Sequence, residues 1–189
     1  MRVLHPLLAA AILASTALVA QAPGYSPDMP AAPSPRVVVP VAPENPLVSM
    51  ARASARRWGL PEAAVLAIVA RESGWNPATT GSAGEMGLMQ VMPSTWDWTV
   101  RRLGVAWTRR QALDPARNLE VGCAHLRWLW EYFWERRARM SCGSLDAAVM
   151  AYNWGQANVA RARGRDRWTP RSVRRYRDAI LLGRGRGDV

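Results

Sequence analysis

The chain has 189 residues and a formal net charge of +11, carried by 25 arginines against 14 acidic residues. His5 lies in the apolar N-terminal region and His125 is the only other histidine, so the histidines and the two cysteines form no metal-binding cluster, and we expect no metal and no cofactor. Arginines interleaved with ten tryptophans are compatible with nucleic-acid binding, and the rest of the sequence must decide whether that partner is available.

Residues 1–22 have the pattern of a secretory signal peptide. Arg2 precedes an apolar stretch over residues 7–20 that is too short to span a membrane comfortably, and small residues follow it. We therefore expect export to the periplasm with no stable membrane anchor after cleavage. Export argues against nucleic acid as a partner, and wall carboxylates or lipid phosphates are then the polyanions that the arginines meet. A solvated arginine-rich face is the plainer alternative.

Residues 23–45 are rich in Pro, Ala and Val and carry few charges, which predicts an extended linker. Residues 46–189 are enough for one domain with a single core and an arginine-rich C-terminal tail. Caps and apolar periodicity predict that this domain is mainly α-helical, with a loop or short hairpin over residues 74–93. The expected helices cover 46–58, 61–73 and 93–103, then start at Pro115, Ser144 and Pro170.

Glu72 continues the apolar stripe of the second helix. Val65, Ile68, Val69 and Glu72 fall on one helical face, so the carboxyl group should be turned toward the core. Burial disfavours the charged form, which keeps a carboxyl group protonated and able to act as a general acid. The alternative from periodicity alone is that Glu72 points to solvent beside Arg71.

Four sequence segments follow Glu72 along the chain. They are SGWNP at 73–77 with GEMGLMQVMPST at 84–95, NLEVG at 118–122, AYNWG at 151–155, and the segment 170–176 with its Pro and Tyr. Over residues 46–180 this order resembles the soluble lytic transglycosylases, lysozyme-like enzymes that cut bacterial peptidoglycan. The resemblance implies a lysozyme-like (goose-type) helical catalytic domain over residues 46–189.

The resemblance also implies a reaction and a set of site residues. Glu72 would protonate the glycosidic oxygen between N-acetylmuramic acid and N-acetylglucosamine, the substrate's acetamido group would stabilise the cation, and Glu72 would then deprotonate the 6-hydroxyl to give an anhydromuropeptide. Gln90 would bind the glycan, Met92 would line the cleft, and Tyr152 and Asn153 would hold the sugar and Glu72. Ser73 beside the acid would bond the loop. Tyr152 also fits a core tyrosine with a satisfied hydroxyl.

Three positions depart from the family pattern. Glu85 stands where a small residue is usual, Gly81 where the pattern has Ser, and Trp154 where it has a small residue. Glu85 is either a base for water, which would make the protein a hydrolase, or a hydrogen-bonding partner within the loop. Trp154 either stacks on a sugar or fills the core.

Two other functions stay open beside the transglycosylase. One is a goose-type lysozyme-like hydrolase, and the other is a non-catalytic peptidoglycan-binding scaffold. The short, single-domain organisation of the chain also resembles that of enzymes that open the wall for secretion, conjugation or flagellar assemblies. If the chain is such an enzyme, an assembly of this kind would be a partner.

The two cysteines, Cys123 and Cys142, are an even number in an exported chain, which favours a disulfide. The long helix would however hold them about 20 Å apart, and a disulfide needs Cα atoms within about 7 Å. The helix geometry therefore predicts two free thiols.

Overall fold

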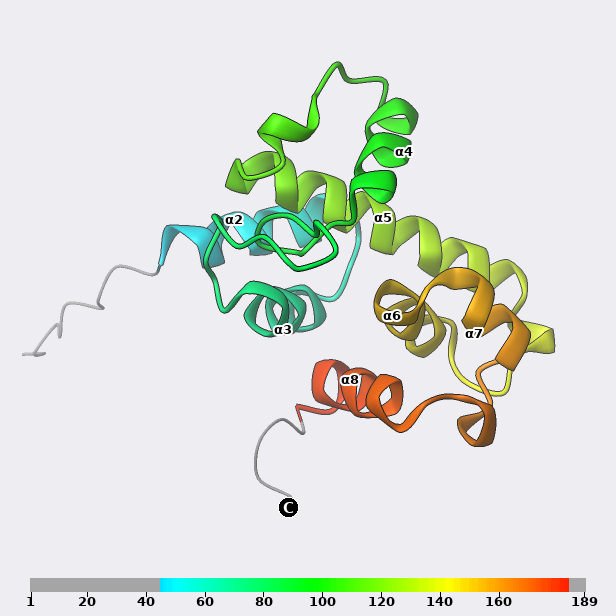
Figure 1. Ribbon diagram of the computed structural model, residues 1–189. Coiled ribbons are helices and arrows are strands. Elements are labelled where there is room, and N and C mark those ends of the chain that lie inside the picture. Colours follow the sequence, from blue (N-terminus) through cyan, green and yellow to red (C-terminus); the bar gives the residue numbers. More distant parts are fainter. Residues whose placement is uncertain (1–44, 184–189) are drawn as a thin grey trace, which may run out of the picture. The chain divides into compact units, whose positions relative to one another are not determined.

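A computed structural model describes residues 45–183 (Figure 1). The predicted signal peptide and all of the predicted linker except Asn45 lie outside these residues and stay predictions. The described part is built from helices, as expected: α2 (Pro46–Arg57), α3 (Glu62–Ser73), α4 (Pro93–Leu103), α5 (Pro115–Glu135), α6 (Ser144–Trp154), α7 (Gln156–Ala162) and α8 (Arg171–Leu181). The predicted mainly α-helical fold is confirmed.

Local sequence signals set the ends of these helices. The Asn45 side chain accepts a hydrogen bond from the Leu47 backbone N–H, and the Asp114 side chain accepts one from Arg117, so each caps the helix that a proline begins. Gly74 ends α3 in the left-handed conformation, with its N–H on the carbonyl of Ala70. The Gly74 cap fixes where α3 stops, and therefore where Glu72 lies.

Helix α5 lies at the centre of the domain and packs against α2, α4 and α6 (Figure 1). Helix α6 also contacts α7 and α8, and α3 lies between α2 and α8. The α5 residues Leu119, Cys123, Leu126 and Phe133 are fully buried, as their spacing predicts, whereas Trp130 is half-buried. One continuous core therefore supports α3 and α8 from the same side.

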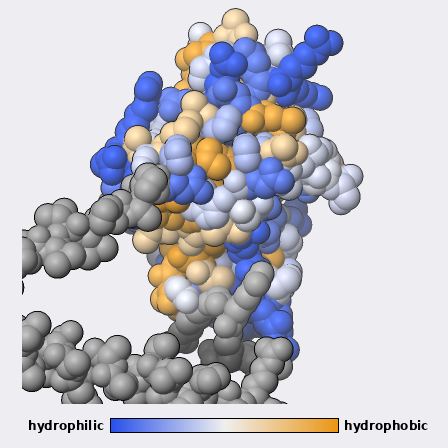
Figure 2. Space-filling model, turned by 90° about the vertical axis from the view of Figure 1, so that its left-hand side faces the viewer, coloured by the Kyte–Doolittle hydropathy of each residue, from blue (hydrophilic) through white to orange (hydrophobic). Residues whose placement is uncertain are grey.

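The surface mixes hydrophilic and hydrophobic residues. Figure 2 shows hydrophilic residues projecting at the edges of one face, with hydrophobic residues lying between them. Within residues 45–183, no helix combines the length and the apolar character that crossing a membrane requires.

The structure differs from the sequence-based expectation in a few places. Helices α3 and α8 begin one residue later than expected, since Pro61 and Pro170 occupy capping positions. Helix α7 was not predicted: it follows α6 directly, separated only by Gly155 at φ +89°. Cys123 and Cys142 are both free, which confirms the prediction from helix geometry.

Candidate active site

The carboxyl group of Glu72 lies half-buried at the end of α3, facing α8. The hydroxyl of Tyr176 donates a hydrogen bond to Glu72 Oε1 at 2.5 Å. Tyr176 is only 3% exposed, and the Arg71 guanidinium lies 5.2 Å from its ring centroid. The periodicity therefore placed Glu72 correctly, but the partner that orients its carboxyl group comes from a helix 104 residues further along the chain.

Burial dominates the electrostatics of this carboxyl group. Desolvation raises the pKa of Glu72, and the charge of Glu85 raises it further. The Tyr176 hydrogen bond and the charge of Arg71 act in the opposite direction but do not cancel the effect of burial. Glu72 therefore keeps its proton to higher pH than an ordinary glutamate, which is the property a general acid needs.

The loop between α3 and α4 folds back on itself beside Glu72. Met86 forms isolated antiparallel bridges with both Thr80 and Val91, so the loop has the character of a small hairpin, as predicted. Gln90 has a positive φ of 46°, and its amide nitrogen donates to the carbonyls of Thr79 and Gly87 at 3.0 and 2.9 Å. Both amide hydrogens of Gln90 are thus used within the loop.

A buried asparagine holds this loop from the α5 side. Asn118 is fully buried; its Oδ1 accepts from the Met89 N–H at 2.8 Å, and its Nδ2 donates to the carbonyls of Met86 and Ala112, both at 2.8 Å. Gly87 lies so close that a Cβ at this position would collide with the Asn118 side chain. One side chain therefore satisfies three backbone groups and sets the path of residues 86–89.

Tyr152 holds the same loop from α6. Its hydroxyl donates to the carbonyl of Met89 at 2.9 Å. Desolvation and the charge of Glu72 raise the pKa of Tyr152 well above its ordinary value, so the hydroxyl remains a donor. The satisfied hydroxyl agrees with the interpretation of Tyr152 as a core tyrosine, and a direct contact with the sugar stays a prediction.

The Glu85 carboxylate has a structural partner. Its Oε2 accepts a hydrogen bond from the Ala83 N–H at 3.0 Å. A Cβ at Gly81 would collide with this same Oε2 and would lie 3.1 Å from Oε1 of Gln90. Two of the three departures from the family pattern are therefore one feature, because the Glu85 carboxylate fills the space that a serine side chain at position 81 would need.

The remaining predicted site residues are placed as follows. Met92 precedes α4 and is 40% exposed, and Asn153 is exposed at the end of α6. Ser73 does not reach the loop: its hydroxyl donates to the Val69 carbonyl in its own helix at 3.2 Å. Trp154 is half-buried, and its carbonyl accepts from Asn158.

Sequence reasoning missed two residues of the site. Tyr176 has the spacing of a core residue with Val173 and Ile180, and the segment 170–176 that resembles the family does not by itself give it a role. Asn118 stands between Arg117 and Leu119 near the start of its helix, where a polar residue is ordinary, so the sequence does not reveal its burial. Once buried, an asparagine needs hydrogen-bonding partners, and only the fold identifies the carbonyls and the N–H group that it serves.

A helical domain with a half-buried glutamate at the end of one helix, beside a hairpin-like loop, has the arrangement of a lysozyme-like domain. Comparison with known sequences identifies the family within this class. The chain belongs to the transglycosylase SLT domain family, whose family model matches residues 49–174.

Named relatives and solved structures agree with this assignment. The chain is 32% identical over 102 residues to the soluble lytic murein transglycosylase of Escherichia coli K12, a match that covers 53% of this chain and 15% of that protein. It is 31% identical to the membrane-bound lytic murein transglycosylase C of Mannheimia succiniciproducens, over 60% of this chain and 32% of that protein.

Among solved structures, an inactive mutant of the lytic transglycosylase Slt from Pseudomonas aeruginosa matches with a TM-score of 0.60 and 26% identity, over 70% of this chain and 22% of that one. The 70 kDa soluble lytic transglycosylase of Escherichia coli matches with a TM-score of 0.59. This chain therefore spans about a fifth of the length of the solved relatives, and the predicted lysozyme-like fold is confirmed.

Proposed function

We propose that this protein is a peptidoglycan lytic transglycosylase, which cleaves the bond between N-acetylmuramic acid and N-acetylglucosamine without water and releases anhydromuropeptides. The observation that carries the proposal is the Glu72 carboxyl group, whose pKa is raised by burial and whose Oε1 is held by Tyr176. The family match and the names of the relatives supply the substrate class.

The proposed reaction uses one carboxyl group twice. Protonated Glu72 gives its proton to the glycosidic oxygen as the bond to the anomeric carbon breaks, and the substrate's acetamido group stabilises the cation. The Glu72 carboxylate then takes the proton of the 6-hydroxyl, whose oxygen bonds to the anomeric carbon and closes the anhydro ring. Tyr176 supports the second step, because its hydrogen bond favours the charged form of Glu72.

The loop and α6 would hold the glycan beside Glu72. Gln90 offers its carbonyl oxygen to a sugar hydroxyl or acetamido N–H, because both of its amide hydrogens are already bound to the loop. Met92 offers an exposed apolar side chain, and Asn153 offers an exposed amide. Tyr152 acts through Met89 as a positioning residue, and Ser73 stiffens the end of α3 through its bond to Val69.

Hydrolysis by a second carboxylate is the competing mechanism. Its candidate base is Glu85, which lies close enough to Glu72 for its charge to raise the pKa of the acid. One oxygen of Glu85 is however bound to the Ala83 N–H, so the contacts favour a structural role in the loop. In this proposal Glu85 shapes the loop and adds to the effect of burial on the pKa of Glu72, and the 6-hydroxyl of the sugar reacts in place of water.

Two single substitutions and one product analysis test the proposal. Glu72→Gln should abolish release from purified peptidoglycan sacculi while helical circular dichroism is unchanged, and Glu85→Gln should retain release. Mass spectrometry of the wild-type products should show anhydromuropeptides. Products with reducing-end muramic acid that depend on Glu85 would establish the hydrolase instead. Binding without any release would establish the non-catalytic scaffold.

We further propose that the protein acts in the periplasm after cleavage of a signal peptide within residues 1–22, with 23–45 as a linker to the wall-cutting domain. The sequence pattern of these segments supports this proposal. The resemblance adds one further proposed role, the local opening of the wall for a secretion, conjugation or flagellar assembly. Detection of the processed protein in a periplasmic fraction tests the location.

A further inference from the structure

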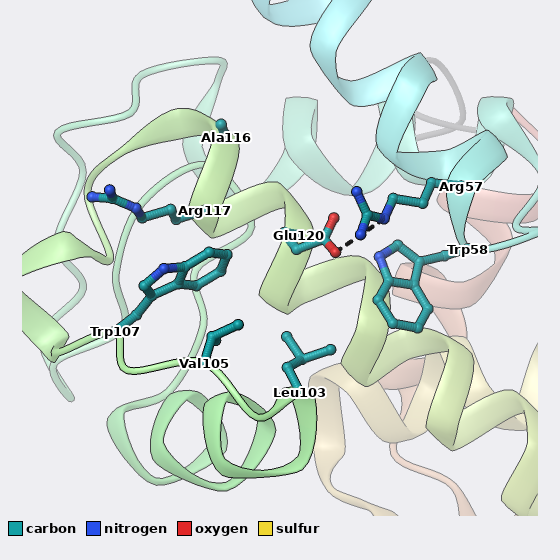
Figure 3. A pocket seen from close by; sticks show the side chains of 8 residues that line it. All are labelled: Arg57, Trp58, Leu103, Val105, Trp107, Ala116, Arg117 and Glu120. Carbon is teal, nitrogen blue, oxygen red and sulfur yellow. Dashed lines mark ion pairs between the residues drawn. The ribbon is translucent and has the colours of Figure 1, made fainter.

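A cavity lies away from Glu72, where the ends of α2 and α4 meet the start of α5 (Figure 3). Its volume is about 460 Å³, within the range of small-ligand sites. The lining residues are Arg57, Trp58, Leu103, Val105, Trp107, Ala116, Arg117 and Glu120. None of them belongs to the site around Glu72.

The helices themselves separate the two sites. Trp58 lies before the start of α3, and Glu72 is its penultimate residue, so the body of α3 holds them about 15 Å apart or more. Leu103 likewise ends α4, whereas Met92 precedes it. The cavity is therefore at the opposite end of both helices from the proposed reaction.

Two indole rings and three charged groups border this cavity. Arg57 Nε and Glu120 Oε1 form an ion pair at 3.2 Å, and the Arg117 guanidinium lies 5.7 Å from the Trp107 ring centroid. Figure 3 shows the Trp58 and Trp107 rings on either side, with the ion pair between them. The walls thus combine flat apolar surfaces with groups that donate and accept hydrogen bonds.

One polar atom of this wall has no partner. The indole Nε1 of Trp58 is shielded from solvent and makes no hydrogen bond within residues 45–183. Figure 3 shows it turned toward the Arg57–Glu120 pair. A shielded N–H without an acceptor is costly, and a ligand oxygen placed in the cavity would relieve that cost.

We propose that this cavity is a second peptidoglycan-binding site, which holds a stretch of glycan with its stem peptide away from the scissile bond. Aromatic rings offer flat apolar faces to sugar rings, Glu120 accepts from hydroxyl groups, and the Trp58 N–H donates to an acetamido or hydroxyl oxygen. Two arginines against one glutamate leave a positive charge, which suits the carboxylates of stem peptides. The identity of the ligand rests on the proposed function.

A second binding site would increase the time that the enzyme stays on its insoluble substrate. A single catalytic domain releases its substrate after each cut, whereas a second contact on the same polymer keeps the enzyme on the wall. Arg57 is 72% exposed at the rim, so a strand can reach it without movement of the helices. The second site should therefore matter for sacculi and not for short soluble fragments.

The binding test uses the full chain with Glu72→Gln, so that the wall is not digested during co-sedimentation with purified sacculi. Adding Trp107→Ala should weaken binding about tenfold, the loss typical of an aromatic anchor. Trp134→Ala is the matched control, since Trp134 is an exposed tryptophan elsewhere on α5 and should leave binding unchanged. Unchanged binding by the Trp107→Ala protein would overturn the proposal.

A second variant keeps the test valid if Trp107→Ala fails to fold. Arg57→Gln changes an exposed side chain, although it also removes the ion pair with Glu120. It should weaken binding to peptide-bearing strands more than to N-acetylglucosamine oligomers, which lack carboxylates. If the variant bound both ligands as tightly as the wild type does, Arg57 would not belong to the site, and the stem peptide would no longer be part of the proposed ligand.

The activity test separates this proposal from the proposed function. With Glu72 intact, Trp107→Ala should retain the wild-type rate on a short soluble muropeptide and lose about tenfold on sacculi. Equal loss on both substrates would show that the cavity acts on the catalytic site and is not a separate wall contact. If the wild type released nothing, the transglycosylase proposal would fail while the co-sedimentation result would still report on the second site.

Discussion

Removing the side chain of Asn118 is the sharpest test of how the active-site loop is held. Asn118→Ala leaves three backbone groups without their partner: the Met89 N–H and the carbonyls of Met86 and Ala112. Each lost bond is 2.8 Å long in the native protein, and the asparagine is fully buried. The substitution therefore creates several unsatisfied polar groups at once in the interior.

The magnitude follows from the cost of such groups. A buried donor or acceptor without a partner costs about 1–3 kcal/mol, and water entering the space left by the side chain offsets part of the sum. We expect a loss of about 3–5 kcal/mol in the free energy of unfolding. For a domain of this size, that corresponds to a melting temperature lower by about 10–15 °C.

Function should be lost before the fold is. The Met89 carbonyl is the acceptor for Tyr152, and Gln90 and Met92 follow Met89 directly, so a shift of Met89 displaces the residues proposed to hold the glycan. At a temperature where circular dichroism still shows the native helix content, release of anhydromuropeptides should fall by at least about tenfold, since small misplacements near a reaction centre are costly.

Asn158→Ala is the matched control for this substitution. Asn158 is half-buried and makes a single side-chain bond, to the Trp154 carbonyl, at 2.7 Å. Its loss should cost about 1 kcal/mol or less. If thermal melting gave the same small change for both variants, Asn118 would not be what holds the loop and the reasoning would be refuted.

Two further predictions concern the neighbours of Glu72 and of the loop. Tyr176→Phe should lower the turnover number about ten- to a hundredfold, which is the effect of losing a hydrogen bond to a charged group. It should also move the alkaline limb of the pH–rate profile to higher pH, because that bond lowers the pKa of Glu72. An unchanged profile would exclude Tyr176 from the site. Gly87→Ala should destabilise the protein by about 2 kcal/mol more than the control Gly104→Ala. Both glycines have φ near +70°, but only at Gly87 would the new Cβ collide with Asn118. Equal changes in melting temperature for the two variants would contradict this.

The elements that the sequence predicted correctly are those fixed by local interactions. Asn45 and Asp114 cap helices through side-chain bonds to residues two or three positions away, and Gly74 ends α3 through its own conformation. Such signals lie within a few residues of the feature they determine. The position of Glu72 on the buried face of α3 could be predicted for the same reason.

The features that the sequence did not reveal depend on contacts between distant segments. Tyr176 meets Glu72 across 104 positions and Tyr152 meets Met89 across 63, and no periodicity within one helix encodes either pairing. Helix α7 is too short for a periodic pattern to identify it. It is separated from α6 only by Gly155, whose positive φ turns the backbone between the two helices. Long-range packing decides all three.

In the proposed reaction Glu72 donates a proton and then accepts one, and its surroundings favour each of these two states by opposing effects. Burial and the Glu85 charge favour the protonated acid that starts the reaction, whereas the Tyr176 hydrogen bond and Arg71 favour the carboxylate that finishes it. A Cβ at residue 81 would collide with the Glu85 carboxylate, so the glycine leaves the space that this carboxylate fills. Gly81→Ser should therefore displace the Glu85 carboxylate and remove its contribution to the raised pKa of Glu72, which is smaller than the contribution of burial.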